Sequence, residues 1–166
     1  GLLMGVQVKT AQFLGANDLH RIGAVFQRGM AYSLTLGTGF MILLLVAGLG
    51  FLGFAVTPEM AQGAKVPIII FAVSMPLFLP GIVCTQFLEA LGRTRDTLIA
   101  TLLANAVNVV LLLLLVPGHV NLFGVHFEGA MGAATATLIA RALQSIGLLI
   151  HVMCLKEARP FDLLGK

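Results

Sequence analysis

The chain has 166 residues, of which 58% are hydrophobic and only 10% are charged, and its mean hydropathy is +1.01. Soluble domains carry roughly 25% charged residues and disordered chains are less hydrophobic still, so the composition excludes both classes and indicates an integral membrane protein. The formal net charge of +3 is explained by basic loop residues and requires no nucleic-acid partner.

A membrane-spanning helix needs about 20 mostly apolar residues, and long windows with few or no charged residues define the expected spans. Residues 1–15 are interpreted as the end of an earlier span. Full spans are predicted at 29–54, 66–90, 97–117 and 129–155. No run alternates apolar and polar residues as a membrane β-strand does. The sequence therefore predicts an all-α, polytopic transmembrane helix bundle with about four full spans and part of a fifth.

Helix boundaries and bends are indicated by prolines and capping residues. Residues 57–59, Thr-Pro-Glu, have the pattern of a helix start, with Pro at the first helical position. Asp96 is expected to cap the helix predicted to begin at Thr97. Pro76 and Pro80 lie inside the second full span and are expected to kink it.

Basic residues are concentrated in alternate connections between the spans. Of the ten lysines and arginines, only Lys65 lies in the connections at about 55–65 and 118–128. The positive-inside rule places the other connections in the cytoplasm, so the span at 29–54 is predicted to run outward. The cytoplasmic set comprises Lys9, Arg21, Arg28, Arg93, Arg95, Lys156, Arg159 and Lys166.

Residue types that carry enzyme or metal chemistry are sparse. Cys84 and Cys154 lie in apolar runs and are expected to be free helix residues. The four histidines are too scattered for a metal site, and there is no phosphate-binding loop, HExxH or GxSxG motif. The sequence predicts no enzyme, no metal site and no cofactor.

A polar stripe crosses the span at 97–117. Thr101, Asn105 and Asn108 recur at i, i+4 and i+7, on one face of a helix. Because amides in a bilayer must find hydrogen-bond partners, this face is expected to contact other protein or water. Two interpretations stay open: the stripe holds helices together, or it lines a polar transport path.

Arg141 lies near the middle of its span, where an arginine costs at least about 2.5–3.5 kcal/mol on insertion scales. It is expected to face the bundle interior or an aqueous cavity, with Thr137 one turn away. A role in the transport path and a structural role as a tether to backbone carbonyls both remain open. In the same helix, small residues at Gly129, Ala133, Ala136 and Ala140 are predicted to form a packing face.

Glu89 precedes Arg93 by four residues, a favourable spacing for an ion pair on a helix. The simpler interpretation is a surface salt bridge worth well under about 1 kcal/mol. The alternative is a cytoplasmic latch that breaks and forms as the protein changes state.

Four motifs resemble those of the multidrug and toxic compound extrusion (MATE) family. Residues 11–18, AQFLGAND, resemble the AQxxGAGD-like end of its second helix, and residues 87–95, FLEALGRTR, resemble its LEGLGRTR stretch after helix four. Residues 104–108, ANAVN, resemble its ANxxN in helix five, and residues 129–141, GAMGAATATLIAR, resemble its GxxGAAxATxIAR start of helix six. The resemblance covers nearly the whole chain, from the end of helix two through helix six of a twelve-helix family.

The resemblance implies a cation-coupled antiporter in the plasma (bacterial inner) membrane. In this family two six-helix lobes rock about a central cavity, and entry of Na⁺ or H⁺ drives the export of small organic cations. Residues 1–166 would then be part of the N-terminal lobe, half of a two-lobe transporter. They would lack helix one and the C-terminal lobe and be inactive alone. By motif match, Asn108 and Thr137 fall where some members line a cation site, with Asn105 beside them.

The chain departs from the family pattern at Leu112, one turn after Asn108, where Asp or Asn is frequent. The span interiors also contain no acidic residue, so a coupling carboxylate is expected outside these residues and the coupling ion stays open. Two alternatives remain. One is a lipid-linked sugar flippase of the same superfamily, which Arg141 leaves open. The other is a non-transporting scaffold subunit, against which the stripe at Asn105 and Asn108 counts.

Overall fold

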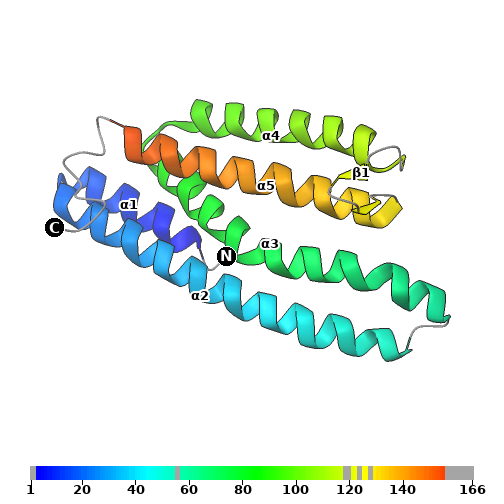
Figure 1. The fold of residues 1–166 in the computed structure, drawn as a ribbon. Helices are drawn as coiled ribbons and strands as arrows, with labels where there is room; N and C mark the ends of the chain where they lie inside the picture. The colour runs from blue at the N-terminus through cyan, green and yellow to red at the C-terminus, as the bar shows by residue number, and fades with distance from the viewer. Residues whose placement is uncertain (1–2, 55–56, 118–120, 123–124, 127–128, 156–166) are drawn as a thin grey trace.

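The computed structural model describes residues 3–54, 57–117, 121–122, 125–126 and 129–155. Within these residues the chain forms long helices and one very short strand pair (Figure 1). The elements are α1 (Met4–Gly15), α2 (Leu19–Phe51), the 3-10 turn η1 (Leu52–Phe54), α3 (Pro58–Ala90), α4 (Thr94–Leu115), β1 (Asn121–Leu122), β2 (Val125–His126) and α5 (Gly129–Cys154).

Four of the described helices are long and apolar enough to cross a membrane, with mean hydropathies of 1.5 to 2.5. Large apolar side chains lie exposed on their outer faces, as at Val46 and Leu113, each 71% exposed. Such a surface suits contact with lipid acyl chains. The prediction of an all-α, polytopic bundle is confirmed. The candidate spans are Leu19–Phe54, Ala61–Ala90, Thr94–Leu115 and Gly129–Cys154.

Two helices begin earlier than the apolar windows predicted. α2 begins at Leu19 rather than near residue 29, and α3 begins at Pro58 rather than near residue 66. Hydropathy marks the part of a helix that lies in hydrocarbon, whereas the helix continues into polar surroundings until a residue stops it. Gln, Lys and Arg favour helix, so nothing ends these helices sooner. Pro58 occupies the first helical position, as predicted, where its missing N–H costs nothing.

α4 begins at Thr94, three residues before its predicted start, and ends at Leu115. Its N-cap residue is Arg93 and no side chain caps it, so the prediction that Asp96 caps this helix is wrong. Asp96 instead lies in the first turn, where a carboxylate faces the positive end of the helix dipole. Gly92 makes the preceding turn with a φ of 76°, a conformation that glycine adopts without strain.

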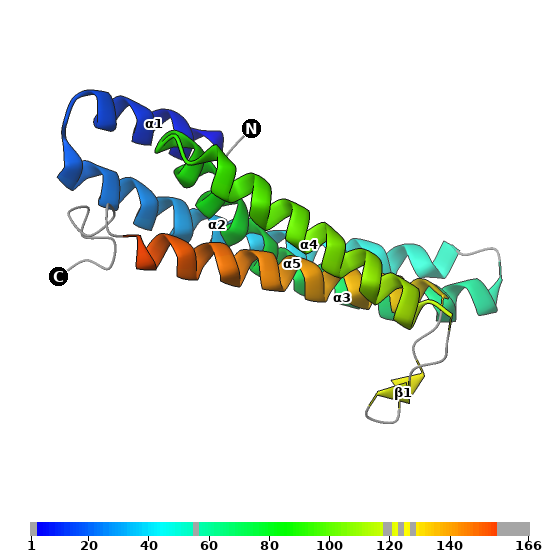
Figure 2. The same cartoon turned by 90° about the horizontal axis from the view of Figure 1, so that it is seen from above.

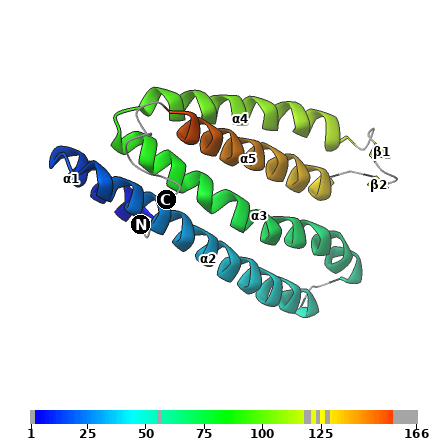
Figure 3. The same cartoon turned by 60° about the vertical axis from the view of Figure 1, so that its left-hand side comes forward.

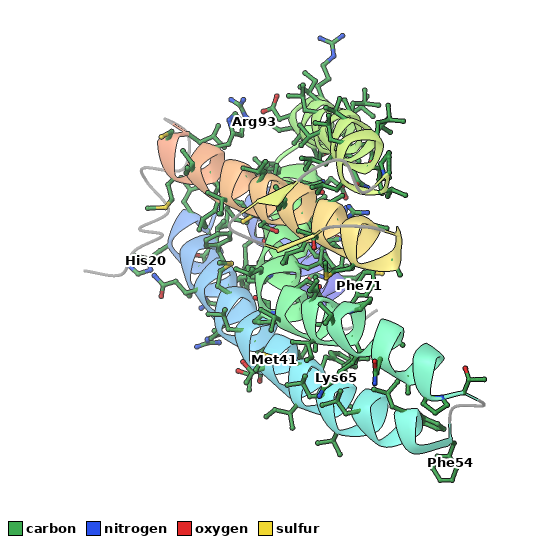
Figure 4. The ribbon with its side chains drawn as sticks, turned by 45° about the vertical axis from the view of Figure 1, so that its right-hand side comes forward. His20, Met41, Phe54, Lys65, Phe71 and Arg93 are labelled. Atoms are coloured by element: carbon green, nitrogen blue, oxygen red, sulfur yellow. The ribbon has the colours of Figure 1, made fainter. Side chains whose placement is uncertain are left out.

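The long helices lie side by side in the order α2, α3, α5 and α4, so α3 and α5 occupy the middle of the bundle (Figures 1 and 3). α1 packs against α2 and α3 at one end. β1 and β2, an antiparallel pair that the sequence analysis did not predict, lie at the other end (Figure 2). Figure 4 shows His20 and Arg93 at the α1 end and Phe54 at the far end.

α3 carries Pro67, Pro76 and Pro80 within its helix, and it bends along its length (Figure 1). A proline inside a helix removes a backbone hydrogen bond and clashes with the preceding turn, which accounts for the bend. α2 approaches the bend closely, because a Cβ added at Gly37 would lie 2.7 Å from the Cα of Pro76. Glycine at this position therefore permits the contact between α2 and α3.

The apolar core joins α1, α2, α3 and α5 at the end of the bundle where α1 packs. Phe26 and Phe87 lie within it, with ring centroids 4.8 Å apart. Cys84 is buried in this core and Cys154 is exposed, and both are free cysteines, as predicted. The buried members of the core are Val6, Ile22, Phe26, Val83, Cys84, Phe87, Leu88, Leu148, Val152 and Leu155.

Candidate functional site

A chain of hydrogen bonds links α5 to α4 near the middle of the bundle. Arg141 Nη1 donates to Gln144 Oε1 over 3.1 Å, and Gln144 Nε2 donates to Thr101 Oγ1, also over 3.1 Å. The Arg141 guanidinium lies over the Phe78 ring of α3, 5.4 Å from its centroid. The mid-span cation is therefore held by an amide oxygen and an aromatic face rather than by a carboxylate.

Gln144 was missed by the sequence analysis. It lies three residues after Arg141, a spacing that places two side chains together on one helix face. Because glutamine is uncharged, it did not stand out among the apolar residues of the span. Its spacing of three residues from Arg141 could have indicated the hydrogen bond between these two side chains. Its bond to Thr101, 43 residues away, had no local signal.

The helix register places Asn108 at the height of Thr137. α4 and α5 run antiparallel, and this register is set by the bond between Thr101 and Gln144 and by the contact between Leu115 and Gly132. A Cβ added at Gly132 would lie 2.5 Å from Leu115 O. The Thr137 hydroxyl donates to Ala133 O over 2.9 Å, which leaves its oxygen able to accept or coordinate.

The Asn108 side chain carries a buried acceptor without a partner. Its Oδ1 is inaccessible and, among the residues that the structure describes, has no hydrogen-bond partner. A buried amide oxygen left unsatisfied costs about 1–3 kcal/mol, so in the complete protein a donor or a cation at this position would be stabilising. The polar stripe divides accordingly: Thr101 bonds to a neighbouring helix, Asn105 is exposed on α4, and Asn108 presents a free acceptor.

Glu89 and Arg93 do not pair with each other in the part of the chain that the structure describes. Gln7 Nε2 of α1 donates to Glu89 Oε2 over 3.3 Å, and Arg93 Nη1 lies 3.3 Å from Asp96 Oδ2. The predicted spacing fails because α3 ends at Ala90, so Arg93 lies beyond the helix on which an i, i+4 pair would form.

A second contact that the sequence analysis missed joins the first turn of α4 to the last turn of α5. His151 Nε2 lies 2.9 Å from Asp96 Oδ2, and a cavity of about 370 Å³ between the two helices is lined by this pair and by Gln144. Among the described residues, no group of three His, Cys, Asp or Glu side chains is placed to hold a metal ion.

The predicted packing face of α5 is only partly as expected. Ala136 and Ala140 are buried, and Ala133 is partly buried, whereas Gly129 is exposed at the helix start. The glycine that packs closely against α4 is Gly132 rather than Gly129, and it lies against the backbone of Leu115.

Comparison with known proteins agrees with this fold. A family model described as MatE matches residues 1–114. A "Probable multidrug resistance protein NorM" of Caulobacter vibrioides is 42% identical over 167 residues, which cover 100% of this chain and 35% of that protein. A protein with the same name from Bacillus cereus is 33% identical over 97% of this chain and 34% of its own length. The chain thus spans about a third of these relatives.

A solved structure has the same fold. It is described as "Inward-facing conformation of a multidrug resistance MATE family transporter of the MOP superfamily". The two structures superimpose with a TM-score of 0.83 at 22% sequence identity, over 98% of this chain and 36% of the other.

Proposed function

This chain belongs to the MatE family, and from that membership we propose that it forms part of an antiporter that exports small organic cations in exchange for Na⁺ or H⁺. It is a multi-pass integral protein of the plasma (bacterial inner) membrane, from a family of transporters rather than of enzymes. Alternating access requires a second lobe, so we propose that residues 1–166 do not transport by themselves.

The observation that carries this proposal is the free acceptor at Asn108. The Asn108 amide oxygen is buried and has no partner within the described part of the chain, and Thr137 lies at the same height on the facing helix. Amide and hydroxyl oxygens are ligands for hard cations such as Na⁺ and acceptors for a protonated carboxyl group. We propose that these two oxygens form one side of the coupling-ion path.

Arg141 and Asn105 have separate roles in this proposal. Arg141 lies one turn from Thr137 and bonds to Gln144, which bonds to Thr101 on α4. We propose that Arg141 acts through Gln144 to hold the rotation of α4, and with it the position of Asn108. Asn105 is exposed in this structure, and we propose that it meets the path only when the rest of the transporter is present.

A cation beside Arg141 needs a compensating negative charge. The span interiors of this chain contain no acidic residue, and uncompensated charge is costly in the membrane interior. We therefore propose that a carboxylate from another part of the full-length protein completes the site.

The test is the ion dependence of efflux in the full-length protein and in Asn108→Leu, normalised to folded protein. Leucine cannot coordinate a desolvated cation, so the variant should lose the dependence of efflux on Na⁺ or pH. The proposal expects this loss in a variant that still folds at a normal level. Thr38→Leu is the control, since it also replaces a polar side chain with leucine, but at an exposed position of α2 where the Thr38 hydroxyl bonds to Leu34 O of its own helix. This variant should retain the dependence. Unchanged ion dependence in Asn108→Leu, at equal abundance, would contradict the proposal.

The two alternative functions make different predictions. A flippase for lipid-linked sugars would need accessible cationic groups for an anionic substrate, but the Arg141 guanidinium is engaged by Gln144 and Phe78. A scaffold subunit would show no ion-dependent efflux in any variant. Vesicles that contain the full-length protein, assayed with an organic-cation dye under an imposed Na⁺ or pH gradient, separate both from the antiporter.

A further inference from the structure

A groove between α1 and α2 lies outside the proposed ion path. Its cavity has a volume of about 490 Å³. Apolar side chains of both helices form most of its wall, with Lys9, Arg28 and Tyr32 as the polar lining residues. We propose that this groove binds an anionic phospholipid of the cytoplasmic leaflet, with the phosphate at Lys9 and Arg28 and an acyl chain along the apolar wall.

Lys9 and Arg28 bring two positive charges to the groove. Within the part of the chain that the structure describes, neither Lys9 nor Arg28 forms a salt bridge, whereas Arg21 pairs with Asp18 and Arg93 pairs with Asp96. Both side chains are exposed and belong to different helices. A lysine and an arginine across one groove present the donors that phosphate oxygens accept.

Their depth in the membrane matches a lipid headgroup. α1 and α2 form an antiparallel hairpin with a short turn at 16–18. Arg28 lies nine residues into α2 and Lys9 six residues before the end of α1, so both are about 9–14 Å above the shared turn. Arg28 is also the last charged residue before the uncharged stretch at 29–58. Tyr32, one turn deeper and 69% exposed, belongs to the interfacial region that tyrosine prefers.

The groove continues from the cations toward the hydrocarbon. Val6 and Leu36 line it on the membrane side of Lys9 and Arg28. The space beside Gly5 is open, because a Cβ added there would meet no heavy atom within 4 Å. Gly29 closes its floor, since a Cβ there would lie 2.7 Å from Val6 Cγ2. A free phosphate would use the two cations alone, whereas a lipid uses the cations and the apolar wall together.

The first experiment measures lipid binding to the full-length protein in detergent. The protein is titrated with dioleoylphosphatidylglycerol or dioleoylphosphatidylcholine, and bound lipid is counted by native mass spectrometry. We expect a preference for phosphatidylglycerol that weakens about tenfold or more in Lys9→Gln/Arg28→Gln, given the contribution of each basic residue near anionic lipid. Arg21→Gln, which removes a cation already paired with Asp18, should keep the preference.

The second experiment blocks the groove without changing charge. Gly5→Leu should reduce binding of both lipids, because its side chain fills the acyl position. Gly39→Leu is the matched control, since Gly39 is exposed on α2 and its added Cβ also meets no atom within 4 Å. Unchanged phosphatidylglycerol preference in the folded double variant, unchanged binding in Gly5→Leu, or displacement of the lipid by excess inorganic phosphate would each overturn the proposal.

Discussion

Gln144 Nε2 donates a hydrogen bond to Thr101 Oγ1 over 3.1 Å, joining α5 to α4. The Thr101 hydroxyl in turn donates to Thr97 O over 2.8 Å, so its oxygen is both donor and acceptor. Together with Arg141 and the Phe78 ring, this contact connects α3, α4 and α5 in the middle of the bundle. The contact joins two helices, and its α4 residue, Thr101, lies on the same helix as Asn108.

Thr101→Val should lower the stability of the full-length protein by about 1 kcal/mol, in the range measured for hydrogen bonds between membrane helices. Valine has the same shape but leaves the Gln144 amide without its acceptor. Thr135→Val is the control, because among the described residues the Thr135 hydroxyl bonds within its own helix, to Met131 O. Thermal unfolding in detergent measures both. Equal losses would mean that the contact between helices contributes nothing beyond the local hydroxyl bond.

Gly81→Ala should disrupt the packing of α3 on α5. A Cβ at Gly81 would overlap Ser145 Oγ and lie 3.0 Å from its Cβ, so the helices must separate or shift at a cost of about 1–3 kcal/mol. Ser145→Gly in the same protein should recover part of this loss, and a double-mutant cycle measures the coupling. Gly39→Ala, in open space on α2, should not lower the unfolding temperature, because alanine favours helix more than glycine does. Additive effects of Gly81→Ala and Ser145→Gly would show that the two positions are not in contact.

Asp96→Asn should weaken the connection between α4, α5 and the turn before α4. The Asp96 carboxylate accepts from both Arg93 and His151, and replacing it removes the negative charge shared by the two. We expect a fall in Tm smaller than that of Thr101→Val, and smaller again at high salt, because the pair is partly exposed and screened. Asp18→Asn, which removes the more exposed pair with Arg21, should have less effect. A loss in Asp96→Asn that is independent of salt would exclude an electrostatic origin.

The turn at Arg93 and Arg95 should face the cytoplasm, and the connection at 118–128 should face outward, because the excess of lysine and arginine sets the direction of insertion. Single cysteines at Thr94 and Asn121, in a background without Cys84 and Cys154, should react with a membrane-impermeant maleimide from opposite sides. Labelling of both from outside intact cells would reject this orientation.

Helix type and number were predictable because they depend on local properties. A long apolar window commits the backbone to helix, since lipid offers no partner for free N–H and C=O groups. The start of α3 at Pro58 followed from proline chemistry. Where helices began earlier than predicted, as α2 does at Leu19, hydropathy had marked the membrane boundary rather than the end of the helix.

The partners of the polar side chains depended on the tertiary structure. The contacts of Gln144 with Thr101, of His151 with Asp96 and of Gln7 with Glu89 join residues 43, 55 and 82 positions apart, and no local pattern relates them. The stripe on α4 was visible as a periodicity. The sequence did not show that Thr101 bonds to another helix, that Asn105 is exposed and that the Oδ1 of a partly buried Asn108 is inaccessible. Each outcome depends on how far a helix is rotated about its axis against its neighbours, and side-chain packing between α3, α4 and α5 sets that rotation.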